Sequence, residues 1–263
     1  MTAASEPMQG SRREGGPLAG TVELELTVSA VTEVTPSMRR LTFTAPELAA
    51  FTHEPGQDLM FTIPNGDRSV RRRYTIRSHD AGAASLDVDA VLHGHGPAAR
   101  WFSDAAPGTT VTALGPRGKV ILRPDADWHL FVGDDSAVPV TLAFLEALPA
   151  DARVIAIVEV DGPEHEQPSD RAVEWVHRGG DGLADPAALL ARLAATELPD
   201  GTGAVYLNGE RGVVNALRDQ LRERGVDPER IATKAYWVRD EANGDHGEPI
   251  PPGGMRGVRR APG

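Results

Sequence analysis

The chain has 263 residues, a formal net charge of −11 and no cysteine. Its length is enough for two domains, each with an apolar core. The acidic balance argues against a protein that binds nucleic acid through overall positive charge. The lack of cysteine excludes disulfides, thiolate metal sites, cysteine nucleophiles and cysteine-ligated iron–sulfur clusters. Any electron carrier must therefore be bound without sulfur ligands.

The two ends of the sequence differ in composition from the middle. Residues 1–19 are rich in Gly, Ser, Pro and charge, and residues 241–263 are rich in Gly, Pro and Arg, so both are predicted to be disordered tails. The N-terminus lacks a charged segment followed by an apolar run, and no apolar stretch reaches about 18 residues. These features predict a cytoplasmic protein without membrane insertion.

Residues 20–123 contain short alternating apolar runs separated by Gly and Pro turns, a pattern typical of antiparallel barrels. The runs are 22–31, 38–44, 58–63, 70–76, 86–92, 110–114 and 119–122. A helix is expected at 97–105, because Pro97 suits a first helical position. We predict a six-stranded antiparallel β-barrel for this part of the chain.

After residue 123 the pattern changes to alternating strands and helices. Strands are expected at 128–132, 154–160, 172–176, 204–207 and 231–237, and helices at 137–148, 185–195 and 213–224. Alternation of this kind indicates an open, mostly parallel sheet with helices on its faces. Residues 124–240 are therefore predicted to form an α/β domain of the type that binds nucleotides.

The segment Arg71-Arg72-Arg73-Tyr74-Thr75 places guanidiniums, an aromatic ring and a hydroxyl on one predicted strand. In a strand, Arg72 and Tyr74 point to one side, and Arg71, Arg73 and Thr75 point to the other. An Arg beside a Tyr suits a flavin dinucleotide, because the guanidinium pairs with diphosphate oxygens and the ring covers a flat heterocycle. The alternative is a basic, solvated edge strand that discourages aggregation.

A second candidate site is the segment 93–101, with the sequence His-Gly-His-Gly-Pro-Ala-Ala-Arg-Trp, which runs from a strand into a helix. Small residues let the backbone approach a ligand, and the free N–H groups of a first helical turn favour an anion such as a diphosphate. An ordinary turn is the alternative. His93 and His95 lack a third ligand of suitable spacing, so no metal is predicted.

The third segment, Gly133 to Pro139, lies where the first strand of the α/β domain meets its helix. Ligands bind at this edge of open α/β sheets. Two aspartates would repel a diphosphate, so Asp134 or Asp135 suits ribose hydroxyls better, and Ser136 suits a helix cap. A capping box without a ligand is the alternative.

The second strand of this domain leads into an acidic segment, Asp161 to Glu166. A 2′-phosphate would need arginine near this strand end. NADH therefore looks more compatible than NADPH, unless the pocket borrows Arg178 or Arg211 from elsewhere in the chain.

The last expected strand closes with Lys234-Ala235-Tyr236-Trp237. A flexible ammonium group beside aromatic rings suits an anionic substrate or one face of a flavin. The alternatives are a solvated Lys234 and a buried Trp237 that only packs.

The four segments, in this order and spacing, resemble the ferredoxin–NADP reductase superfamily and, within it, the siderophore-interacting protein family of flavin-dependent ferric-siderophore reductases. The resemblance implies an FAD cofactor and NADH, NADPH or a ferredoxin-type protein as electron donor. It implies a ferric siderophore, a small anionic iron chelate, as the substrate whose Fe(III) is reduced to Fe(II) for intracellular release. The cofactor would carry the reaction, so no catalytic side chain is expected.

By this resemblance, Arg72 holds the FAD diphosphate, Tyr74 stacks on the isoalloxazine and Thr75 lies near its reactive nitrogen. The family's usual Glu-Thr pair is replaced here by Asp135-Ser136, which shortens one side chain and removes a methyl group. The implied cofactor positions are Arg72, Tyr74, Thr75, Val91, His93, Gly94, Gly96, Pro97, Ala98, Ala99, Asp134 and Ser136. The implied substrate pocket is Arg73, Arg77, Lys234 and Trp237.

Two other hypotheses remain open at the level of sequence. A flavoenzyme with the same cofactor site can pass its electrons to another small acceptor or to a protein partner, because a superfamily fold does not determine the acceptor. A binding protein that sequesters a ferric chelate without turnover would have a vestigial flavin site. The intact Arg72, Tyr74 and Thr75 count against this second alternative.

Overall fold

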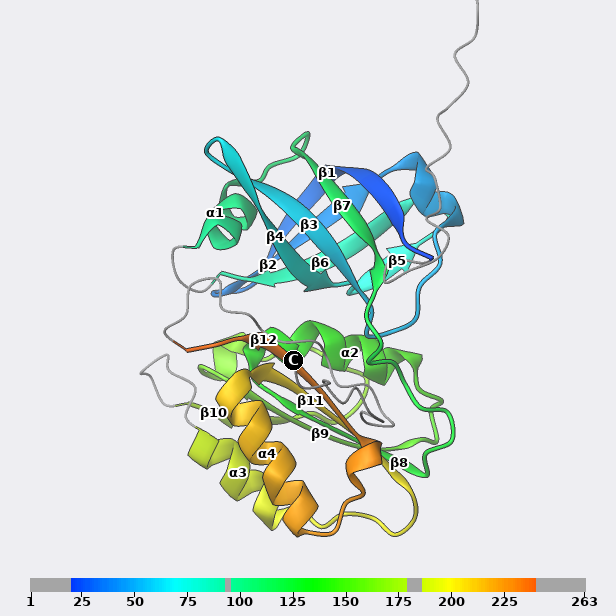
Figure 1. Cartoon of the computed structure of the whole chain (residues 1–263), viewed down its shortest axis with the longest axis vertical. Helices are drawn as coiled ribbons and strands as arrows, with labels where there is room; N and C mark the ends of the chain where they lie inside the picture. Colours follow the sequence, from blue (N-terminus) through cyan, green and yellow to red (C-terminus); the bar gives the residue numbers. More distant parts are fainter. Residues whose placement is uncertain (1–19, 93–95, 179–185, 240–263) are drawn as a thin grey trace, which may run out of the picture.

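The computed structural model describes residues 20–92, 96–178 and 186–239. The two predicted tails lie outside the described residues. The chain forms an antiparallel sheet followed by a parallel sheet with helices (Figure 1). The segment around residue 123, where the domain boundary was expected, connects the two sheets.

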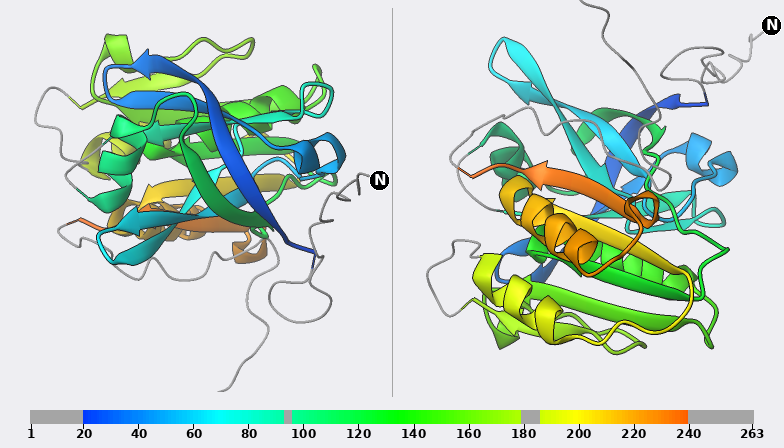
Figure 2. Two further views of the ribbon diagram at one scale, coloured as in Figure 1. Left: turned by 90° about the horizontal axis from the view of Figure 1, so that it is seen from above. Right: turned by 60° about the horizontal axis from the view of Figure 1, so that its bottom comes forward.

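The antiparallel sheet is curled into a half-barrel (Figures 1 and 2). Its strand order is β4-β3-β7-β1-β2-β6-β5. The strands are β1 (Val22–Thr35), β2 (Met38–Thr44), β3 (Asp58–Asn65), β4 (Arg68–Thr75), β5 (Ser78–Asp80), β6 (Ser85–Val91) and β7 (Thr110–Arg117). The predicted antiparallel architecture is confirmed, with seven strands in the described sheet instead of six, because the short β5 pairs with β6 at one edge.

The strand predicted at 119–122 is wrong. Gly118 has a φ of +105°, which ends β7, and the residues after it form no strand. Val120 is nevertheless buried, in the core between the two sheets. Its burial explains why an irregular segment carries the apolar pattern of a strand.

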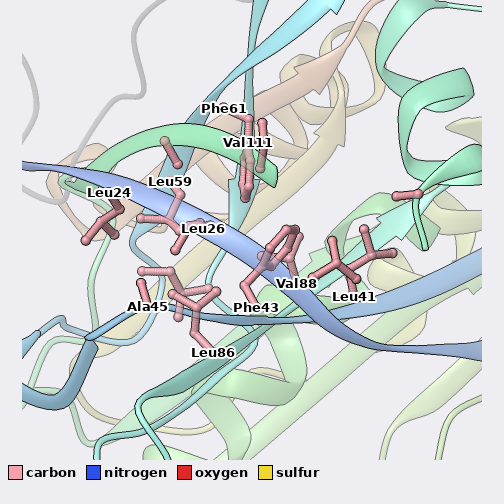
Figure 3. Packing of buried hydrophobic residues seen from close by; sticks show 14 of the residues in the cluster. Leu24, Leu26, Leu41, Phe43, Ala45, Leu59, Phe61, Leu86, Val88 and Val111 are labelled. Carbon is pink, nitrogen blue, oxygen red and sulfur yellow. The ribbon is translucent and has the colours of Figure 1, made fainter. Parts of the chain in front are cut away.

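Alternating side chains of the strands fill the half-barrel. Figure 3 shows Leu24, Leu26, Phe43, Phe61 and Val88 gathered in this core. The predicted helix is confirmed as α1 (Pro97–Asp104), and Pro97 lies in its first turn. Helix α1 contacts β2, β3, β4 and β6 and places the fully buried Phe102 into the same core.

The second sheet is parallel throughout, in the order β10-β9-β8-β11-β12, which confirms the predicted open α/β architecture. Its strands are β8 (Trp128–Gly133), β9 (Arg153–Val160), β10 (Glu174–His177), β11 (Gly203–Glu210) and β12 (Ile231–Trp237). The helices are α2 (Val138–Ala147), α3 (Pro186–Ala195) and α4 (Arg211–Glu223). No helix within the described ranges is long and apolar enough to cross a membrane.

Helix α2 lies between the parallel sheet and the half-barrel, whereas α3 and α4 cover the outer face (Figures 1 and 2). This position explains why α2 is buried on all sides from Val138 to Leu145, as expected for a helix enclosed by two layers. Met38 of β2 and Val120 belong to the same apolar core as α2. The two domains are therefore joined by a shared core.

Candidate functional site

Strand β4 presents different side chains to its two faces. In the antiparallel register Tyr74 is opposite Leu59 and Arg72 is opposite Phe61, and both partners are fully buried in the half-barrel. Directly opposed residues share a face of the sheet. Arg72 and Tyr74 therefore lie on the barrel side and Thr75 on the side of the α/β domain, which confirms the predicted alternation.

The ring of Tyr74 packs beside the barrel core and α1. Its centroid lies 4.2 Å from that of Phe102 and 5.9 Å from that of Phe61. Burial raises the pKa of the phenol well above its ordinary value, so this side chain is neutral at physiological pH. Tyr74 thus supplies an aromatic surface rather than an acid or base.

Arg72 is half-buried as a residue, and its guanidinium donates to the backbone carbonyl of Arg71, with an Nη1 to O distance of 2.7 Å. Further toward the hairpin turn, Arg68 and Arg71 are exposed, and β4 lies at one edge of the sheet. This outer half of β4 fits the alternative of a solvated edge strand. The inner half, from Arg72 to Thr75, is the part that faces neighbouring structure.

Helix α1 follows β6, whose last residue is the half-buried Val91. Gly96 is the N-cap of α1, and a Cβ atom at this position would meet no atom within 4 Å. The next cofactor positions implied by the sequence, Pro97, Ala98 and Ala99, form the first helical turn. His93 and Gly94, also implied as cofactor ligands, lie outside the described residues.

The side chains of β4 and the backbone N–H groups at the start of α1 have the chemistry needed to bind a flavin dinucleotide. One strand offers a guanidinium at Arg72, a ring at Tyr74 and a hydroxyl at Thr75, and α1, which contacts that strand, begins with small residues at Gly96 and Ala98. Arg pairs with diphosphate, and the free N–H groups of a first helical turn add to that attraction. The FAD assignments of these residues remain predictions.

Asp58 joins the two domains through a buried carboxylate. This residue begins β3 and is 0% exposed. Its Oδ1 accepts from Arg73 Nε at 2.8 Å, and its Oδ2 lies 2.7 Å from both Arg73 Nη2 and Lys234 Nζ. Burial would lower the pKa of Lys234, but the neighbouring Tyr236 and Asp58 outweigh it and hold that pKa above its ordinary value. Lys234 is therefore charged and buried, and the alternative of a solvated lysine is wrong.

A second contact joins the strand of Tyr74 to the last strand of the α/β domain. The hydroxyl of Thr75 lies 3.4 Å from that of Tyr236, and the Lys234 ammonium lies 5.1 Å from the centroid of the Tyr236 ring. Tyr236 thus stands next to the residue expected near the reactive nitrogen of a flavin. It was not among the predicted site residues, although it lies between two of them.

Arg77 and Trp237, the remaining predicted substrate residues, also pair with other side chains of the protein. Arg77 Nη1 donates to Glu146 Oε2 of α2 at 2.7 Å, and its Nη2 lies 2.5 Å from Glu146 Oε1. Trp237 Nε1 donates to Asp134 Oδ2 at 2.9 Å. With Arg73 and Lys234, these side chains hold the two domains and the end of β12 in place. Their assignment to a substrate pocket remains a prediction.

Asp134 connects three segments at the carboxyl end of the parallel sheet. It caps the short helix η2 (Asp135–Ala137) by accepting from the Ser136 backbone N–H at 2.9 Å and also from the Ser136 hydroxyl. Its Oδ2 accepts from the Glu210 backbone N–H at 2.8 Å and from the Trp237 indole. The predicted cap at Ser136 is therefore wrong, because Asp134 is the N-cap. Its predicted contact with a donor ribose remains a prediction.

Glycine is required beside this carboxylate. Gly209 has a φ of +135°, and a Cβ there would lie 2.5 Å from Asp134 Oδ2. At Gly133 an added Cβ would lie 2.3 Å from the Asn208 carbonyl oxygen. The close approach of β8 and β11 thus explains the first glycine of the Gly133 to Pro139 segment.

Asp134 is expected to titrate near neutral pH. Burial, and then the charge of Asp135, raise the pKa of Asp134 to about 6, against the hydrogen bonds that it accepts. Since the ordinary value is 3.8, the folded protein keeps a proton between the two values that the unfolded chain has lost. Stability from this group is therefore complete below pH 3.8 and is lost as pH rises through about 6.

Tryptophan fluorescence checks this expectation, because the Trp237 indole donates to Asp134. We expect a change in emission centred near pH 6 that is absent in Asp134→Asn and in Trp237→Phe. The same transition in Asp134→Asn would assign the titration to another group.

The arginine available for a 2′-phosphate at the end of β9 is already neutralised. Arg178 is 3% exposed, and its guanidinium lies 3.2 Å from Asp135, 3.1 Å from Glu159 and 3.4 Å from Asp161. Burial would lower the pKa of Arg178, but these carboxylates raise it above its ordinary value. The other arginine considered, Arg211, begins α4 directly after Glu210, whose carboxylate caps this helix by accepting from the Val213 N–H at 2.9 Å.

The chain matches two related family models. Residues 126–240 match the model of the siderophore-interacting protein, and residues 54–120 match that of the siderophore-interacting FAD-binding domain. The second match contains Arg72, Tyr74 and Thr75, and the first contains Asp134, Ser136, Lys234 and Trp237.

Several curated relatives extend over most of the chain. An uncharacterized protein of Mycobacterium tuberculosis is 39% identical over 197 residues, covering 69% of this chain and 70% of the relative. The ferric vibriobactin reductase ViuB of Vibrio cholerae is 31% identical, covering 78% of this chain and 86% of ViuB. The NADPH-dependent ferric-chelate reductase of Escherichia coli is 28% identical, with coverages of 81% and 92%.

A solved structure shares the same fold. The siderophore utilization protein from T. fusca superposes with a TM-score of 0.76 and 31% sequence identity, covering 87% of this chain and 97% of that structure. The shared architecture includes both domains.

Proposed function

This chain belongs to the siderophore-interacting protein family, as its four motifs predicted, and we propose that it is an FAD-dependent reductase of ferric siderophores. The proposed reaction takes siderophore-bound Fe(III) to Fe(II), with electrons from NADH or NADPH. The observation that carries it is the strand with Arg72, Tyr74 and Thr75, which lies in the match to the FAD-binding domain and meets Tyr236 of the other domain. The named ferric reductases among the relatives support the same conclusion.

In this proposal the chain's own residues bind and orient the cofactor. Arg72 and the first turn of α1, at Pro97 and Ala98, would hold the diphosphate, and Tyr74 would offer its ring as a neutral stacking face. Thr75 and Tyr236 present hydroxyls where the two domains meet. When bound, FAD supplies the conversion of a two-electron hydride into single electrons for iron. No side chain needs to act as a nucleophile.

Reduction releases the metal because of ligand preference. Hydroxamate and catecholate oxygens are hard donors and hold Fe(III) more tightly than the softer Fe(II). The protein therefore needs to bind the chelate near the flavin without replacing its iron ligands. We place this reaction in the cytoplasm, where NADH and NADPH are both available as electron donors.

For the donor we favour NADH over NADPH. Arg178, whose backbone N–H donates to the Val160 carbonyl at the end of β9, is shared among three carboxylates, and this part of the sheet is acidic. A ribose hydroxyl can donate to a carboxylate, whereas a 2′-phosphate would be repelled by it. A ferredoxin-type donor is the alternative if neither nucleotide reduces the flavin.

The absorption spectrum of the FAD-loaded protein tests the proposal. We expect a flavin band that bleaches on anaerobic addition of NADH, more slowly with NADPH, and that returns when a ferric siderophore is added. Return of the band without formation of Fe(II), followed with a ferrous chelator, would contradict iron reduction. A protein that binds no FAD would instead favour the binding-only alternative.

A further inference from the structure

The cations expected to form a basic substrate pocket are matched by carboxylates of the chain. The charged junction between the domains consists of Arg40, Arg73, Arg77 and Lys234 with Asp58, Asp87, Asp89 and Glu146. Asp58 is shared by Arg73 and Lys234. Arg40 pairs with Asp89 at 2.6 Å. This hydrogen bond, and then the charges of Asp89, Asp87 and Glu146, raise the pKa of Arg40 against the effect of burial. As many carboxylates as cations are therefore present in this junction.

These pairs are built into the fold and are not loose surface contacts. The side chains of Asp58 and Asp89 are at most 1% exposed, and those of Arg77 and Lys234 are 10% and 5% exposed. If Lys234 turned to a polyanion, the buried carboxylate of Asp58 would lose one of its two cationic partners and keep only Arg73, which is costly. Arg77 is also held in place, because it makes two contacts with Glu146 and lies 3.9 Å from the buried Asp89.

The exposed arginines of β4 do not replace the cations of the junction. Arg68 and Arg71 belong to the outer part of the β3–β4 hairpin, whose turn lies at the end of the half-barrel away from the α/β domain (Figure 1). Arg72 is on the barrel side of its strand. Among the described residues, the charged junction thus has no net formal charge, and the whole chain carries a net charge of −11.

We infer that Asp58 and Glu146 determine substrate specificity: by keeping the charged junction neutral, they select ferric chelates of low net charge, such as trihydroxamates, over polyanionic tris-catecholates. This inference deepens the proposed function and rests on it. A ferric trihydroxamate is neutral, because its three hydroxamates balance the metal, whereas a tris-catecholate carries excess negative charge. Where cations are already paired, a polyanion loses its hydration without gaining partners.

Gallium complexes test the inference without electron transfer, because Ga(III) resembles Fe(III) in charge and size and is not reduced. Binding to the FAD-loaded full chain is measured by calorimetry with the Ga(III) trihydroxamate and with the Ga(III) tris-catecholate. We expect the wild-type protein to bind the trihydroxamate at least about tenfold more tightly. The result does not depend on donor or turnover, so it is separate from the spectral test of the reductase.

Two variants release cations from the junction. Asp58→Asn frees Arg73 and Lys234, and Glu146→Gln frees Arg77. Each is expected to raise the affinity for the tris-catecholate by about tenfold and to change that for the trihydroxamate less than about threefold. Glu146 is 57% exposed, so its variant serves if Asp58→Asn folds poorly.

Asp125→Asn is the matched control. Asp125 also pairs with two arginines, Arg123 at 3.3 Å and Arg230 at 3.0 Å, but it lies ahead of β8 and outside the charged junction. It should leave both affinities unchanged. The inference is overturned if the wild-type protein prefers the polyanion, if neither junction variant changes the preference, or if neither gallium complex binds.

Discussion

Replacing Asp58 with Ala is expected to lower the free energy of unfolding by about 3–5 kcal/mol, because removal of one partner leaves a buried charge uncompensated. The affected charge is mainly that of Lys234, whose side chain is 5% exposed, whereas Arg73 at 27% retains more contact with water. The loss should appear as a lower denaturant midpoint with little change in the slope of the transition.

The double variant with Lys234→Met separates the charge effect from the loss of packing. If the buried ammonium causes the loss, Asp58→Ala combined with Lys234→Met should regain about half of the stability lost in Asp58→Ala alone. Asp125→Ala removes an exposed carboxylate with two arginine partners and should cost little. A loss in Asp58→Ala no larger than in this control would contradict the buried role of Asp58.

Tyr74→Ala is expected to weaken FAD binding by at least about 100-fold, because it removes the proposed stacking face. The same change removes contacts with Phe61 and Phe102 and should cost about 2–4 kcal/mol of stability. The bound flavin is measured as the ratio of flavin to protein absorbance after gel filtration, and the affinity by titration of the apoprotein with FAD.

Two controls distinguish stacking from general destabilisation. Tyr74→Phe keeps the ring and should keep FAD. Leu59→Ala alters the fully buried residue opposite Tyr74 on β3 and should lower stability by a similar amount while leaving the affinity for FAD nearly intact. Stoichiometric FAD in Tyr74→Ala would remove the stacking assignment, and FAD loss in Leu59→Ala would attribute the effect to folding.

Much of the fold was predictable because it depends on local patterns. Alternating apolar residues define the strands of the half-barrel, and the buried runs at 154–160 and 204–207 lie within strands of the parallel sheet. Pro97 marked the start of α1. The error at 119–122 arose because a side chain buried from an irregular segment, Val120, produces the same apolar signal as a strand.

The candidate site was also predictable only in the part that depends on local pattern. The residues proposed to hold the flavin, Arg72, Tyr74 and Thr75, lie on a single strand, so their faces could be inferred from the two-residue period of a strand. The pairing of Asp58 with Lys234 could not, because these residues are 176 positions apart in the sequence. A carboxylate at the start of a strand carries no signal of its distant partner.

The sequence therefore determined the two types of sheet, the facing of the residues on β4 and the family, because local periodicity and short motifs carry this information. The tertiary structure alone decided which charges meet. It placed Asp58 against Lys234, Glu146 against Arg77, and Tyr236 against Thr75. Whether an arginine or lysine is available to a ligand depends on its partners in space, and packing of the two domains assigns those partners.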